Sequence, residues 1–94
     1  MGIFDIFTRK KEEPEKARRR YLMERGRVTE GTILDSQTLP QGELVFYAYS
    51  VQGVDFESSE VLTKDRLKDP LKYAPGAKVS VRYDPKNHGN SILE

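Results

Sequence analysis

The chain has 94 residues, a formal net charge of +1, 36% hydrophobic and 33% charged side chains, one histidine and no cysteine. This length predicts a single small domain with a thin core. The missing cysteine excludes disulfides, thiolate metal sites and cysteine nucleophiles. A single histidine argues against a histidine-rich zinc site, and no apolar run approaches the roughly 20 residues of a membrane span. The near-neutral charge indicates no general affinity for nucleic acid.

Residues 1–13 predict a flexible apolar and basic N-terminal arm. Four large apolar side chains are followed by three basic ones: Ile3, Phe4, Ile6, Phe7, Arg9, Lys10 and Lys11. On a helix the four apolar side chains would share one side. The pattern is typical of an interfacial anchor, with the apolar side in lipid and the basic residues on anionic headgroups. We favour a frayed terminus, or one that packs on the domain's own sheet, over such an anchor.

Residues 14–26 predict the N-terminal helix. Pro14 suits the first helical position, and Gly26 follows as a stop signal. A narrow apolar stripe consists of Ala17, Tyr21 and Leu22. Phosphate binding could come from three consecutive arginines, Arg18, Arg19 and Arg20. Consecutive residues spread around a helix, so we favour a solvated face that complements the helix dipole.

Residues 27–94 predict a small β domain. The first strand covers residues 27–39, in which Gly31 marks a bulge or a close approach. The strongest strand covers residues 43–51. Only Gln52 and Gly53 separate it from the next strand pattern, which is the spacing of a tight hairpin. That register pairs Val51 with Val54 and Tyr49 with Phe56, and so brings the large side chains of both strands to one face.

The strand at residues 43–51 has an unusual second face. Val45, Tyr47, Tyr49 and Val51 alternate on the core face, and the opposite face carries Leu44, Phe46 and Ala48. An exposed antiparallel sheet normally has polar residues on its outer side, so we expect something to cover this face. The favoured cover is the N-terminal helix, which would be marginal alone. The alternative is a second copy of the same face in a two-fold dimer.

The C-terminal third predicts a turn, a strand and a second turn. Val79, Val81 and Tyr83 alternate between the turn signals Pro75-Gly76 and Asp84-Pro85. Residues 63–72 predict a surface connection, and His88 is expected to be exposed in a Gly/Asn turn. A short last strand at residues 91–94 should direct Ile92 inward. The predicted fold is therefore mainly β, a small antiparallel curved sheet or partly closed barrel of five to six strands with one N-terminal α-helix.

The sequence contains no pattern that indicates catalysis. No phosphate loop or dinucleotide fingerprint is present, and no carboxylate pair lies among expected core residues. Several tyrosines invite comparison with base-stacking platforms. However, residues 43–62 contain no lysine or arginine and four acidic residues. We therefore predict no enzyme activity, no cofactor, no metal, and no nucleic-acid binding.

Several short motifs together resemble a known family. They are Gly31-Thr32-Ile33, the run Tyr47 to Gly53, Tyr73-Ala74-Pro75-Gly76, the run Val79 to Asn87, and Ser91-Ile92-Leu93. The pattern Val-x-Val-x-Tyr-Asp-Pro-x-Asn is the most specific of these. Over residues 28–94 the chain resembles a widespread family of small bacterial β-domains of unknown function, many of which stand beside transmembrane helices. The resemblance implies a compact, mostly antiparallel β domain and brings no catalytic residues.

The prediction for function is a non-enzymatic β module that binds a protein partner or a second copy of itself. The alternative is a peripheral membrane protein that the basic N-terminal arm holds on an anionic surface. The absence of cysteine fits a reducing compartment. We therefore expect a cytoplasmic protein, either free or peripheral to the inner face of the membrane.

Overall fold

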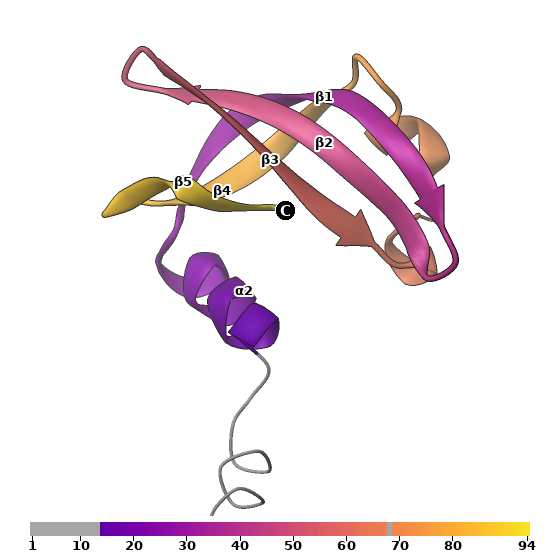
Figure 1. Cartoon of the computed structure of the whole chain (residues 1–94). Coiled ribbons are helices and arrows are strands. Elements are labelled where there is room, and N and C mark those ends of the chain that lie inside the picture. Colours follow the sequence, from indigo (N-terminus) through magenta and orange to yellow (C-terminus); the bar gives the residue numbers. More distant parts are fainter. Residues whose placement is uncertain (1–13, 68) are drawn as a thin grey trace, which may run out of the picture.

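The computed structural model describes residues 14–67 and 69–94. Helix α2 (Pro14–Arg25) comes first and leads into three consecutive strands, β1 (Arg27–Leu39), β2 (Gly42–Val51) and β3 (Val54–Leu62). Two short 3-10 helices follow, η1 (Lys64–Leu67) and η2 (Pro70–Tyr73). The last two strands are β4 (Lys78–Asp84) and β5 (Asn87–Leu93). Figure 1 shows the long curved strands above α2, which lies on the side of β4 and β5.

The five strands form one antiparallel sheet in the order β3-β2-β1-β4-β5. The sheet curls until its two edge strands, β3 and β5, contact each other. In the described part of the chain, the result is a nearly closed barrel with one α-helix, α2, outside it (Figure 1). This confirms the predicted mainly β fold. Closure matters because it divides the side chains into an inner set that forms the core and an outer set that faces solvent or α2.

The tight hairpin between β2 and β3 has the predicted register. Val51 lies opposite Val54, and Tyr49 lies opposite Phe56. Gln52 and Gly53 both have positive φ angles, 53° and 83°. This is the conformation that a two-residue type I′ turn requires, and it matches the twist of the flanking strands.

Strand β1 contains both a close approach and a bulge, at different places. A Cβ at Gly31 would lie 2.7 Å from Val81 Cγ2 and 2.8 Å from the Ala48 carbonyl oxygen. Glycine is therefore needed there because neighbouring atoms come too close for a side chain. The shift in register lies further along, between Ile33 and Asp35.

The core fills the inside of the barrel. Its main cluster contains residues from all five strands and from η2: Ile33, Val45, Tyr47, Tyr49, Val51, Leu62, Tyr73, Val79, Val81 and Leu93. Phe56 and Tyr83, which were expected in the core, are partly buried and pack against this cluster. The Tyr47 hydroxyl lies 2.8 Å from Ser91 Oγ inside the barrel, so this buried hydroxyl has a hydrogen-bond partner.

Strand β5 is longer than the sequence predicted, and the side chain that it directs into the barrel is not the predicted one. It begins at Asn87 rather than at Ser91, because the turn after Asp84 is short. Leu93 pairs with the buried Val81 and belongs to the core cluster. Ile92 therefore faces the other way, on the outer side of the sheet beside Arg82. The expectation that Ile92 points into the barrel was wrong, although its side chain is fully buried.

Candidate binding face of the barrel

Helix α2 covers the outer side of β4 and β5. Its main contacts with the sheet are with these two strands, and the Arg19 side chain also reaches β3. Leu22 of the helix and Ile92 of β5 are both 0% exposed, yet neither belongs to the cluster inside the barrel. Because Ile92 faces outward, the helix is what removes it from solvent. The predicted cover of Leu44, Phe46 and Ala48 by this helix is therefore not what the structure shows.

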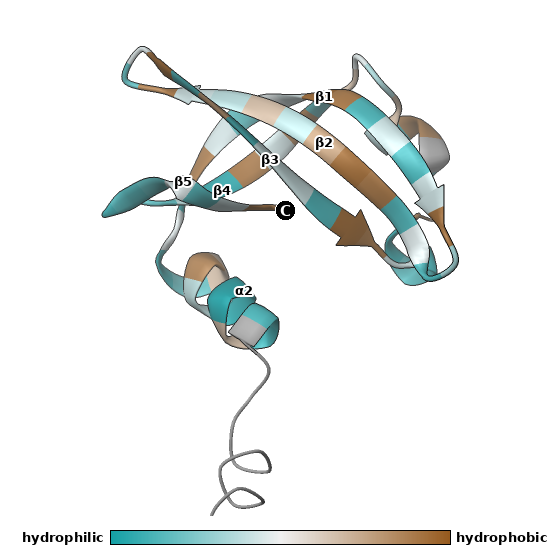
Figure 2. Ribbon diagram, viewed as in Figure 1, coloured by the Kyte–Doolittle hydropathy of each residue, from teal (hydrophilic) through white to brown (hydrophobic). Residues whose placement is uncertain are grey.

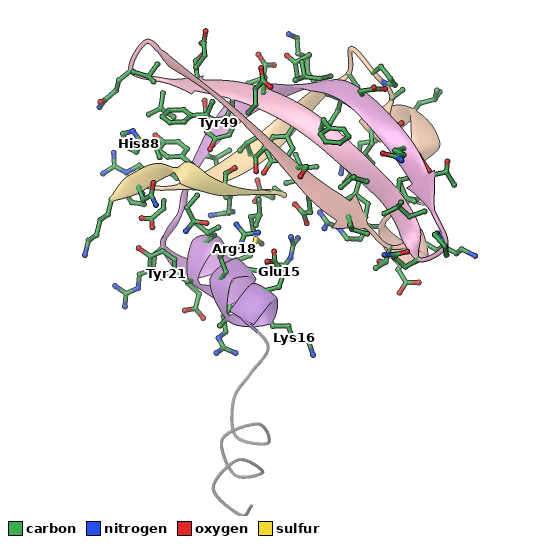
Figure 3. The ribbon with its side chains drawn as sticks, viewed as in Figure 1. Glu15, Lys16, Arg18, Tyr21, Tyr49 and His88 are labelled. Carbon is green, nitrogen blue, oxygen red and sulfur yellow. The ribbon has the colours of Figure 1, made fainter. Side chains whose placement is uncertain are left out.

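Polar contacts fix the helix on the β4–β5 hairpin. The Tyr21 hydroxyl donates a hydrogen bond of 3.1 Å to Asp84 Oδ1. Arg18 Nη1 donates to Asn90 Oδ1 at 2.9 Å and to the Ser91 carbonyl oxygen at 2.8 Å. Figure 3 shows Tyr21 and Arg18 on the side of α2 that faces the barrel. These bonds use the Asp-Pro turn itself as an anchor for the helix.

The carboxylate of Asp84 is held in its charged form. The backbone N–H of Lys86 donates to it at 2.8 Å, and the Tyr21 hydroxyl and the Asn90 side chain add further bonds. The Lys86 bond is the main cause that lowers the pKa of Asp84 below its ordinary value of 3.8. The charged turn therefore stabilises the helix anchor at neutral pH.

Glu60 of β3 joins the two edges of the barrel. Its Oε1 accepts a hydrogen bond of 2.7 Å from the backbone N–H of Leu93 in β5. Its Oε2 pairs with Arg19 at 2.8 Å and with Arg66 at 2.5 Å. Both arginines also donate to the Leu93 carbonyl oxygen, at 3.3 and 3.0 Å. The Glu60 side chain is only 9% exposed. This network connects β3 and β5, the two edge strands, where they meet; we call this junction the seam of the barrel.

Two of the three consecutive arginines on α2 thus do not belong to a solvated face, whereas Arg20 is exposed. Arg18 and Arg19 are half-buried and reach the end of β5. Arg18 is also paired with Glu15, which with a smaller contribution from nearby carboxylates raises the pKa of its guanidinium. Sequence reasoning missed this role because Glu60 and Leu93 are brought to the helix only when the sheet curls.

His88, at the start of β5, lies among aromatic rings. It makes edge contacts with Tyr83 and Phe56, at ring-centre distances of 5.3 and 6.3 Å. Its carbonyl oxygen accepts a hydrogen bond of 2.6 Å from the Tyr49 hydroxyl, and Figure 3 shows the two residues side by side. His88 is half-buried, so the expectation of an exposed surface histidine was wrong. It closes the aromatic end of the core.

The outer face of β2 and β3 is apolar where α2 does not cover it. Phe46 is 36% exposed and Val61 38%, while Leu44 and Ala48 are half-buried. Leu44 lies directly opposite Val61 across the two strands. Figure 2 shows a hydrophobic stretch along the middle of β2. We call the set Leu34, Leu44, Phe46, Ala48 and Val61 the outer apolar face.

Leu34 joins this face because of the bulge in β1. Two residues of β1, Leu34 and Asp35, lie at the position opposite Phe46. Both are exposed, and Leu34 is 45% exposed. A bulge places one extra residue on a strand and re-aims its side chain. No sequence signal distinguished Leu34, and Val61 joins the face because the register of the hairpin continues without a shift as far as Leu44.

Acidic side chains surround the outer apolar face. Asp55 and Glu57 of β3 are exposed and lie opposite Ser50 and Ala48. Glu30 and Asp35 of β1 are exposed on its other side. The basic residue that reaches this part of β1 is Lys78, whose amine donates to Thr32 Oγ1 at 3.1 Å. The face is therefore apolar in the middle and negative at both edges.

A hollow of about 470 Å³ lies where the outer apolar face meets α2. Leu44 and Val61 line one part of it, and Glu15, Arg18, Arg19 and Arg66 line the other. The hollow shows that the first turn of α2 stands beside the end of the apolar face. Its arginines already hold Glu60, Glu15 and the end of β5, so they are occupied.

The Tyr47 hydroxyl is enclosed in the core and already has a partner. The Tyr47 hydroxyl is bonded to Ser91 inside the core, and burial raises the pKa of Tyr47 above 10.0. No group of three His, Cys, Asp or Glu side chains in the described part of the chain could hold a metal ion. No helix among these residues is long and apolar enough to cross a membrane. The candidate lipid-contacting residues, Ile3, Phe4, Ile6, Phe7, Arg9, Lys10 and Lys11, lie outside the described residues.

Comparison with known proteins places the β domain in a family. The family model described as "Domain of unknown function (DUF3592)" matches residues 24–94. This is most of the chain, and the chain therefore belongs to that family. No curated protein and no solved structure matches. The matched region begins near the end of α2, so it contains the whole barrel and the outer apolar face, but little of the helix.

Proposed function

For this member of the DUF3592 family, we propose a non-enzymatic binding module that takes a protein segment on the outer apolar face. The observation that carries the proposal is the exposure of Phe46 and Val61 on the solvent side of an antiparallel sheet. Such a side is normally polar, and clustered exposed apolar residues mark interaction sites. We further propose that the protein acts in the cytoplasm, either free or at the inner face of the membrane.

The charges around the face favour a protein over nucleic acid. Partly open five-stranded barrels often bind oligonucleotides on the face of their second and third strands, so fold analogy alone would suggest such a ligand. In this chain the corresponding strands carry Asp55 and Glu57, and residues 43–62 contain no lysine or arginine. Phosphate groups would be repelled there, since affinity for nucleic acid depends on basic residues.

The same charges favour a different protein over a second copy. In a two-fold dimer the same face meets itself. The acidic edges of β1 and β3 would then approach the acidic edges of the partner copy, and like charges across an interface are unfavourable. A segment with apolar side chains flanked by lysine or arginine would instead fill the apolar middle and neutralise the edges. The proposed partner is therefore an apolar and basic segment.

The proposal is tested by capture from lysate with three forms of the full-length chain. The wild type and Val54→Lys, which changes a valine at the hairpin that is 54% exposed, should retain the same protein. Phe46→Lys should reduce its capture by about tenfold or more, because an aromatic residue in the middle of an interface often contributes over 1.4 kcal/mol. Circular dichroism of each variant checks that the barrel is intact.

Three results would count against the proposal. If no captured protein depends on Phe46, the outer apolar face is not a binding site. If sedimentation shows that the Phe46-dependent species is the chain itself, a homodimer replaces the proposed partner. If the wild-type chain floats with anionic vesicles through residues 3–11 and captures no protein, the peripheral membrane alternative replaces it.

A further inference from the structure

We propose that residues 1–13 of this chain occupy the outer apolar face and cover it in the absence of a partner. The inference rests on the proposed function, because it assigns an intramolecular occupant to the same face. The occupant is defined by its chemistry. It carries Ile3, Phe4, Ile6 and Phe7 for the apolar middle, followed by three basic residues for the acidic edges.

The place where the segment joins α2 is the first support. Glu15, in the first turn of the helix, lines the same hollow as Leu44 and Val61. The segment therefore joins the described structure beside one end of the face. An extended chain advances about 3.4 Å per residue, so Phe7 can lie up to about 24 Å from Pro14. The stretch from Leu44 to Ala48 is only about 13 Å long. The connection is long enough without disturbing the helix.

Charge complementarity is the second support. The segment brings Arg9, Lys10 and Lys11, and the face offers four exposed carboxylates: Glu30, Asp35, Asp55 and Glu57. A second copy of the acidic face offers no such match.

Because residues 1–13 are covalently attached to the domain, even a weak contact would be sufficient to cover the outer apolar face for part of the time. A short covalent connection gives the attached segment an effective concentration on the order of 1 mM. An intrinsic dissociation constant near 1 mM would then cover the face about half of the time. An external partner would meet a face that is free for the remaining fraction, so its apparent affinity would fall about twofold. The segment would act as an internal competitor that any partner must displace.

The experiment uses the full-length chain and paramagnetic broadening. The chain contains no cysteine, so Gly2→Cys gives a single site for a nitroxide label. We expect the amide signals of Phe46 and Val61 to lose about half of their intensity or more, as the half-covered state predicts. The amide of Lys86, which is exposed in the turn between β4 and β5, should lose much less. A mixture of labelled unenriched chain with unlabelled ¹⁵N chain separates contacts within one molecule from contacts between molecules.

A second variant keeps the proposal falsifiable. Phe4→Ser with Phe7→Ser removes the aromatic contacts while retaining every charge, and should abolish the selective broadening. Broadening that is equal on Lys86 and Phe46, or that survives this variant, would overturn the proposal. Selective broadening seen only in the mixture would also overturn it, since the occupant would be a second chain. Absence of broadening together with binding to anionic vesicles would assign the segment to lipid.

The two proposals fail separately. Selective broadening without any Phe46-dependent captured protein would support the intramolecular cover and remove the external partner. Phe46-dependent capture without selective broadening would support the partner and remove the cover. If both hold, deletion of residues 2–11 should strengthen capture about twofold, as expected when an internal competitor that covers half of the sites is lost.

Discussion

The barrel has two apolar outer faces, and helix α2 covers only one of them. The side of β4 and β5 has a large apolar residue, Ile92, and is sealed by α2 through Leu22. The side of β2 and β3 has Phe46 and Val61 and remains exposed. Both sides are apolar enough to require a cover, so hydrophobicity alone did not choose where the helix lies.

Polar anchors explain the choice. The β4–β5 hairpin offers Asp84, Asn90 and the carbonyl oxygens at the end of β5, which accept hydrogen bonds from Tyr21 and the arginines of α2. The outer side of β2 and β3 offers serines and carboxylates at the edge, and the core of that face has no comparable acceptors. A helix with a narrow apolar stripe and many arginines is therefore better matched to β4 and β5. The uncovered face is left for another segment.

The largest expected effect comes from charging the sealed face. Leu22→Asp places an unpaired carboxylate at a site that is 0% exposed. Such a change costs about 3 kcal/mol or more of unfolding free energy. Denaturant unfolding followed by circular dichroism measures it. The matched control is Met23→Asp, the next residue on the same helix, which is 41% exposed. Its effect should stay below about 1 kcal/mol. Equal effects from the two variants would contradict the placement of α2 on β4 and β5.

The next effect concerns the seam that links α2, β3 and β5. Glu60→Ala removes the acceptor of the Leu93 N–H and the partner of Arg19 and Arg66. We expect a loss of about 2 kcal/mol, because a poorly exposed N–H loses its bond while the arginines keep some access to water. Glu57→Ala, on the same strand but exposed, should change stability by less than about 0.5 kcal/mol. If Glu60→Ala and Glu57→Ala have the same midpoint of thermal unfolding, the Glu60 network does not stabilise the fold.

The smallest effect is a dependence on pH. The pKa of Asp84 is lower in the folded protein than its ordinary value of 3.8, so the charged turn contributes stability at any pH well above 3.8. That contribution is lost as the pH falls below 3.8 and through the lowered pKa. Asp84→Asn removes the titrating group, so stability near neutral pH should fall, and the acid-induced loss should become shallower than in the wild type. Parallel acid profiles of the two proteins, measured by denaturant midpoint, would show that Asp84 is not responsible.

Local patterns determined much of this protein. Alternation placed Val45, Tyr47, Tyr49 and Val51 inside, since strand side chains point to opposite faces in turn. Gln52-Gly53 selected the hairpin register because that turn needs two positive φ angles. The same register placed Leu44, Phe46 and Ala48 together on the outer side. These features depend on residues close in sequence, so sequence periodicity was sufficient to predict them.

Features that depend on distant residues were decided only by the tertiary structure. The bulge that exposes Leu34 beside Phe46, the network around Glu60 and the packing of His88 on Tyr83 each join separate strands of the closed barrel. The inward or outward facing of Ile92 depended on where β5 pairs with β4, a register that no local turn signal specified. Helix α2 is anchored by hydrogen bonds to Asp84 and Asn90, which lie more than 60 residues away in the chain. Closure of the sheet creates these contacts, and before closure the sequence contains only their separate parts.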